Sequence, residues 1–95
     1  MDIASRVKDL IKDSIEKEGY ILDDVLYVKE DGNYYLRVII DKNGIIDIND
    51  CVTVTKIVDP MLDGVEYITD SYILDVCSKE KGSWLKWIVK SLLKH

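Results

Sequence analysis

Histidine and long apolar runs are scarce in this chain of 95 residues, and each scarcity excludes a class of protein. The only histidine is His95, so no internal imidazole is present to act as a general base or to join a Cys-His metal cluster. No apolar run approaches the roughly 20 residues that cross a bilayer, and residues 1–10 contain no signal-peptide core. We therefore expect a cytoplasmic protein without metal, cofactor or membrane contact.

Catalytic motifs are also missing. The sequence has no phosphate-binding glycine motif and no nucleophile elbow, and acid pairs such as Asp23 with Asp24 have no nucleophile to assist. We predict that the protein is not an enzyme. Cys51 and Cys77 are far apart in the sequence, and we interpret them as small core residues, with a disulfide or a reactive thiol as the alternative.

The stretch "IIDKNGIIDINDC" at residues 39–51 is similar in composition to a calcium-binding loop, but its spacing is wrong. An EF-hand needs glycine at its sixth position and glutamate at its twelfth. Counting from Asp41 places Gly44 fourth and Val52 twelfth. We interpret the stretch as a tight turn followed by a helix start, with Asp47 as N-cap and Asp50 closing an acidic capping box.

The chain is long enough for one ordinary domain, and 47% of its residues are hydrophobic. Its charge is unevenly distributed. Residues 1–78 contain 8 Lys or Arg against 17 Asp or Glu, a net charge of −9, whereas residues 79–95 contain 5 Lys against 1 Glu, a net charge of +4. An acidic body is a poor ligand for phosphate backbones and suits a basic protein better.

Hydrophobic periodicity predicts the elements of an α+β fold. Apolar residues at steps of three and four predict a helix over residues 2–18, ended by Gly19. Residues 20–30 and 33–41 form a predicted hairpin around "DGN", with one face toward the helix. In its second strand, one face is formed by Leu36, Val38 and Ile40 and the other by Tyr35, Arg37 and Ile39. The capped segment 48–62 is a second helix despite its β-branched residues, and residues 67–78 form a third strand. The order α-β-β-α-β predicts a two-layer α/β sandwich.

Two faces follow from these elements. The third strand alternates Tyr72, Leu74 and Val76 against Ile73, Asp75 and Cys77. One face of the second helix is expected to be buried. The residues on that face are Ile48, Cys51, Val52, Val58 and Leu62.

The last residues, "GSWLKWIVKSLLKH", predict a separate short amphipathic helix that is basic on one side. Its candidate contact residues are Trp84, Trp87, Lys86, Lys90 and Lys94. This helix could pack on the sheet, pair with a second copy to give a homodimer, or lie on an anionic surface such as RNA, with weak direct contact. We expect a division into an α/β domain at residues 1–78 and a basic tail at residues 79–95.

The segments "GYILDDVLYVKEDGNYYLRVIIDKNGIIDINDC", "VDPMLD" and "DSYILDVCS" together resemble the N-terminal domain of the RimP family, the bacterial ribosome maturation factors. The resemblance covers about residues 3–78. It implies a non-enzymatic factor of two-layer α/β form that binds the immature small ribosomal subunit. Members of that family usually continue through Ser-Pro-Gly into an SH3-like barrel, whereas Ser78 is followed here by "KEK". A divergent single-domain relative, a truncated product and a partner-binding remnant all fit this difference.

The resemblance also implies a set of partner-binding candidates on the hairpin: Asp23, Asp24, Tyr27, Glu30, Arg37 and Asp41. We interpret them as part of an acidic surface for a basic ribosomal protein of the small subunit. The alternative is that they are solvated strand residues and cross-strand ion pairs. A different class of function also stays open, in which the chain is a self-associating interaction module that uses its C-terminal helix.

Overall fold

The structure is a computed structural model that describes residues 2–79 and 93–94. Along this part of the chain the elements are α1 (Ile3–Lys17), β1 (Ile21–Glu30), β2 (Asn33–Asp41), α2 (Ile48–Leu62), β3 (Tyr72–Ser78) and β4 (Leu93–Lys94). The predicted order α-β-β-α-β is therefore confirmed, and β4 adds a short strand that the sequence did not predict.

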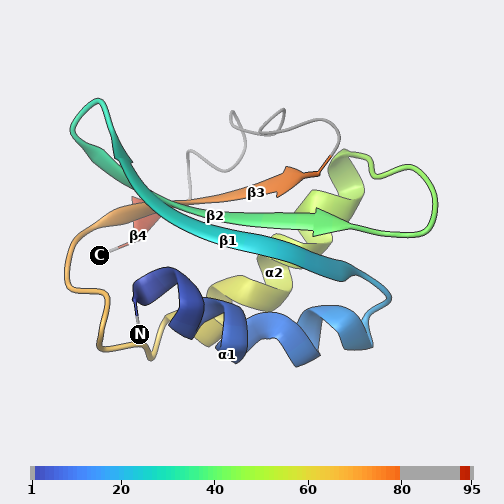
Figure 1. The fold of residues 1–95 in the computed structure, drawn as a ribbon, viewed down its shortest axis with the longest axis horizontal. Helices are drawn as coiled ribbons and strands as arrows, with labels where there is room; N and C mark the ends of the chain where they lie inside the picture. The colour runs from blue at the N-terminus through green and yellow to red at the C-terminus, as the bar shows by residue number, and fades with distance from the viewer. Residues whose placement is uncertain (1, 80–92, 95) are drawn as a thin grey trace.

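The strands form one sheet in the order β1-β2-β3-β4. β1 and β2 are an antiparallel hairpin, β2 and β3 are parallel, and β4 is antiparallel to β3. A parallel neighbour requires a crossover connection, and α2 provides it. Figure 1 shows α1 and α2 together on one side of the sheet, which confirms the predicted two layers.

Local chemistry fixes the ends of the helices. The Asp2 side chain caps α1 by accepting the Ser5 N–H at 2.8 Å, and Gly19 follows the helix with φ +90. α2 begins with the predicted capping box: Asp50 N–H donates to Asp47, and Asp47 N–H donates to Asp50. The hairpin turn places Asp31 at φ 51 and Gly32 at φ 82, as its sequence predicts.

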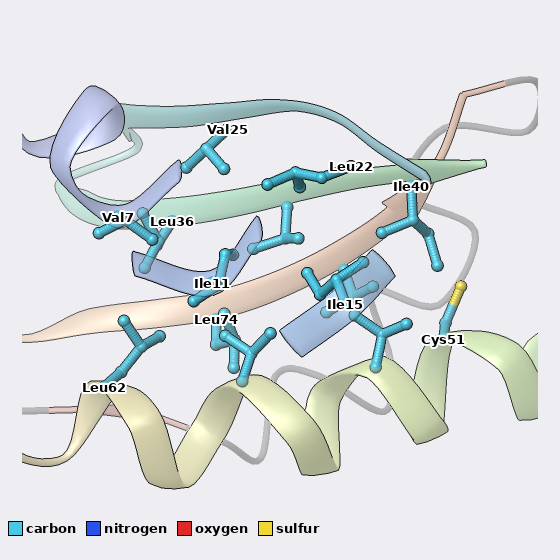
Figure 2. Packing of buried hydrophobic residues seen from close by; sticks show 14 of the residues in the cluster. Val7, Ile11, Ile15, Leu22, Val25, Leu36, Ile40, Cys51, Leu62 and Leu74 are labelled. Carbon is cyan, nitrogen blue, oxygen red and sulfur yellow. The ribbon is translucent and has the colours of Figure 1, made fainter. Parts of the chain in front are cut away.

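The core lies between the helices and the sheet. Val7, Ile11 and Ile15 of α1 are fully buried, as are Leu36, Val38 and Ile40 of β2. Figure 2 shows Ile11 and Ile15 between the strands and α2, with Leu62 and Cys51 reaching toward them from α2. Cys51 and Cys77 are buried and are not joined in a disulfide, which confirms their interpretation as core residues, and burial raises the pKa of the Cys51 thiol to about 12.

Three predictions need correction. The buried face of α2 consists of Cys51, Val54, Thr55, Val58 and Leu62, so Ile48 and Val52 were wrongly placed in the core. Val54 and Thr55 are buried instead. Consecutive β-branched residues place apolar groups on more than one side of the helix, and packing against the sheet determines which side is buried. β3 begins at Tyr72 rather than at residue 67.

The predicted C-terminal helix is the third correction. It is wrong at Leu93 and Lys94, which form β4 opposite Ile73 and Tyr72. Backbone pairing with the edge of β3 explains the extended conformation there, since backbone hydrogen bonds join the two strands. Trp84, Trp87, Lys86 and Lys90 lie outside the residues that the structure describes.

Candidate functional site

Arg37 is the centre of an ion-pair cluster on the sheet face that points away from the helices. It pairs with Asp75 across β2 and β3, and strand alternation places both side chains opposite the core face. Arg37 Nη1 and Nη2 donate to the two carboxylate oxygens of Glu30 at 3.0 and 2.7 Å, and Nε donates to Asp75 at 3.2 Å. One guanidinium thus joins three strands of the sheet.

Burial differs strongly between the two acids of this cluster. The side chain of Asp75 is 1% exposed, that of Arg37 is 15% exposed, and that of Glu30 is 46% exposed. The Arg37 guanidinium also lies 5.0 Å from the ring centroid of Tyr35. The hydrogen bonds that Arg37 donates to Glu30, and to a lesser extent to Asp75, raise the pKa of Arg37 above its ordinary value, although burial opposes them. The Arg37 guanidinium therefore stays positively charged beside the carboxylates of Glu30 and Asp75.

Asp23 and Asp24 are adjacent in β1 but have different partners. The register of the β1–β2 pair shifts between Leu22 and Asp24, so Asp23 is the extra residue of a β-bulge. Asp23 lies 3.5 Å from Lys79 Nζ, and Asp24 lies 3.6 Å from Lys8 Nζ of α1. The two neighbouring carboxylates therefore form ion pairs with different parts of the chain, Asp24 with α1 and Asp23 with the residue after β3.

A second polar cluster surrounds the start of α2. Asp50 accepts the Tyr20 hydroxyl at 2.8 Å and Lys42 Nζ at 2.9 Å, in addition to the Asp47 N–H. Burial alone would raise the pKa of Asp50, but these donors lower it to about 2. Burial and the Asp50 carboxylate raise the pKa of Tyr20 to about 12. This cluster ties the end of β2 and the segment after α1 to the α2 cap.

Tyr27 is on the opposite face of the hairpin from Arg37, on the side of the helices. Its ring is stacked on Tyr34 with centroids 5.1 Å apart and an interplanar angle of 4°. An open hollow of about 500 Å³ lies beside it, bordered by the first turn of α1 and by Tyr67. Burial, followed by the negative charge of Asp70, raises the pKa of Tyr27.

With this geometry in place, the chain can be compared with known families. The model of the RimP N-terminal domain matches residues 10–79, which is most of the chain. The chain belongs to the RimP family. That family consists of ribosome maturation factors, and membership associates this chain with the maturation of the small ribosomal subunit.

The RimP match spans all of β1, β2, α2 and β3, so it contains every candidate residue of the hairpin. The structure does not gather these candidates into one cluster. Glu30 and Arg37 share the outer face, Tyr27 lies on the helix side, and Asp23 and Asp24 reach toward different partners. Asp41 lies at the end of β2, where its carboxylate accepts the Lys42 N–H at 2.9 Å.

Several polar residues of this RimP domain were not singled out from the sequence. Asp75 was grouped only with Ile73 and Cys77 on one face of its strand, and its ion pair with Arg37 joins residues 38 positions apart. Tyr34, Tyr67 and Arg6 come from three segments that meet at the hollow. For Tyr34 and Tyr67, the only signal in the sequence is the total of six tyrosines.

Neither a metal-ligand cluster nor a membrane-spanning helix is found among the described residues. Within residues 2–79 and 93–94, no His, Cys, Asp and Glu side chains gather in groups of three that could hold a metal ion. Neither of the helices in this part of the chain is long and apolar enough to span a membrane.

Proposed function

We propose that this chain acts as a RimP-type maturation factor that binds the immature small ribosomal subunit by contact alone, without catalysis. The observation that carries the proposal is the match of residues 10–79 to the RimP N-terminal domain. Bacteria assemble the small subunit in the cytoplasm, so we also propose a cytoplasmic location for the protein.

The charge of the body supports a basic protein as the direct partner. Residues 2–79 contain 9 Lys or Arg against 17 Asp or Glu, a net charge of −8. Four of those cations are held in ion pairs with acids of the chain: Lys8, Arg37, Lys42 and Lys79. A surface with surplus carboxylates attracts a basic partner at long range and repels RNA phosphates.

The hairpin is the part of the body that we propose as the contact surface. It presents Asp23, Asp24 and Glu30 on β1, whose side chains are 34%, 50% and 46% exposed. Asp41 extends this surface at the end of β2, and Arg37 holds Glu30 in a fixed orientation. Tyr27 lies on the helix side of the hairpin and is not part of this surface. The basic tail at residues 79–95 is a separate segment in this proposal and contributes at most weak RNA contact.

Co-sedimentation with immature small subunits at low and high salt tests the proposal. We expect the chain to sediment with the particles at low salt and to be released as salt screens the charges. The Asp23→Asn/Asp24→Asn double variant should bind more weakly. Asp9→Asn/Asp13→Asn on the exposed side of α1 is the matched control, because it removes the same charge elsewhere.

Two results would contradict this function. If the chain does not sediment with immature subunits at either salt concentration, subunit binding itself is wrong. If both double variants weaken sedimentation equally, net charge rather than the hairpin surface is responsible. Concentration-dependent self-association without subunit binding would favour an interaction module.

A further inference from the structure

The hollow at the first turn of α1 has features of a binding site that the proposed hairpin surface does not use. It is bordered by Asp2, Ile3, Ala4, Arg6, Tyr27 and Tyr67 and has a volume of about 500 Å³. Figure 1 shows the start of α1 beside the loop that leads from α2 to β3. Three separate segments of the chain therefore form its walls.

Tyrosine rings dominate these walls. Tyr34 covers one face of the Tyr27 ring and holds it in place, and Tyr67 faces the hollow from the loop. The phenolic oxygen of Tyr27 is buried and has no hydrogen-bond partner among the described residues. A buried hydroxyl without a partner is unfavourable, so a group that donates a hydrogen bond to this oxygen recovers stability.

The chain itself places cations on neighbouring rings. The Arg6 guanidinium lies 4.7 Å from the centroid of Tyr67, and Lys29 Nζ lies 5.4 Å from that of Tyr34. Both distances fall within the range of cation–π attraction. Tyrosine rings at this end of the molecule therefore already have cations as neighbours.

Charge around the hollow favours a cationic ligand over an anionic one. Asp2 borders it, the charge of Asp70 acts on Tyr27, and Glu66 precedes Tyr67. The loop at residues 63–71 contains three acids and no Lys or Arg. Arg6 and Lys29 offset these acids only in part.

We infer that this tyrosine hollow binds an arginine side chain of the basic partner protein. The inference rests on the proposed function, because it assigns a contact point for that same partner. A guanidinium is flat, stacks on aromatic rings and carries several N–H donors, so it suits a site with tyrosine walls and an acidic rim better than a lysine ammonium does.

The first test uses the full chain and a fluorescent hexa-arginine peptide, with hexa-lysine for comparison. We expect tighter binding of hexa-arginine, and Tyr67→Leu should weaken it about two- to fivefold, the range of one cation–π contact. Tyr27→Phe keeps the ring but removes the hydroxyl, so it should weaken binding by a similar factor through the loss of one hydrogen bond. Tyr20→Phe is the matched control, since it removes a hydroxyl at the other end of α1. Tyr27→Phe should leave the fold at least as stable, so its effect would report binding rather than unfolding.

Equal binding of the two peptides, or equal binding by all variants, would overturn the inference and indicate general charge attraction. Preferential binding of a single-stranded oligoribonucleotide, lost in the same variants, would overturn it in favour of a nucleic-acid site.

The second test adds the hollow variants to the subunit sedimentation experiment. Weaker sedimentation of Tyr27→Phe and Tyr67→Leu than of Tyr20→Phe supports the inference. If these variants lose peptide binding but sediment normally, the inference is wrong and the proposed function stands. If the unmodified chain does not sediment, the proposed function fails, and with it the assignment of a ribosomal partner to this hollow.

Discussion

Replacing Arg37 by Met should be among the most damaging single changes on the outer face of the sheet. The substitution removes the guanidinium that hydrogen bonds Asp75, whose side chain is 1% exposed, and leaves a methionine of similar length in its place. Removing one partner of a buried ion pair typically costs 3–5 kcal/mol, because the remaining charge loses its counterion. Arg37 is itself 15% exposed, so we expect the lower end, about 3 kcal/mol.

Glu30→Gln is the matched comparison, because it breaks the other half of the same cluster. Glu30 is 46% exposed, and an ion pair with such exposure contributes about 1 kcal/mol or less. The two variants therefore separate the buried from the exposed contact of one guanidinium. In a domain of this size, 3 kcal/mol corresponds to a fall in Tm of about 12–24 °C.

Urea unfolding followed by far-ultraviolet circular dichroism measures both free energies of unfolding. The double variant Arg37→Met/Asp75→Leu should recover most of the loss, because an apolar pair avoids the buried charge. The reasoning is refuted if Arg37→Met costs no more than Glu30→Gln, or if the double variant is as unstable as the sum of the single changes.

Three further outcomes are expected. Asp50 has a folded pKa of about 2 and an ordinary value of 3.8, so its stabilisation is present above pH 3.8 and is lost as pH falls toward 2; acid titration of Asp50→Asn should lack this component of about 2 kcal/mol. Asp47→Ala should lower the free energy of unfolding by about 1 kcal/mol through loss of the α2 cap, measured in urea. Ile11→Ala, at 0% exposure, should cost about 3 kcal/mol, whereas Leu10→Ala, at 40% exposure, should cost less than about 1 kcal/mol in the same assay.

The parts of the fold that the sequence predicted are those controlled by neighbouring residues. The α2 cap depends on Asp47 and Asp50, three positions apart, and the hairpin turn depends on Asp31 and Gly32. Such signals are local, so they can be read without knowing the tertiary structure. The alternation of Leu36, Val38 and Ile40 similarly follows from the two-residue period of a strand.

The features that escaped prediction depend on contacts between distant segments. No local pattern joins Arg37 to Asp75, because parallel pairing of β2 and β3 brings them together. The tyrosine hollow requires α1, β1 and the loop before β3 in their final positions. The hairpin candidates were predicted as one surface, but a strand sends successive side chains to opposite faces, and the bulge at Asp23 shifts that alternation by one residue.

The parallel pairing of β2 and β3 has a consequence for how the chain reaches its native state. The hairpin closes over a two-residue turn, whereas β3 must find β2 after the α2 crossover, so the slow step is the docking of the third strand. A slip of one residue would turn Asp75 toward the apolar layer under the helices and expose Leu74 and Val76. The Arg37–Asp75 ion pair thus selects the correct alignment among competing ones, and its loss should slow folding as well as weaken the folded state.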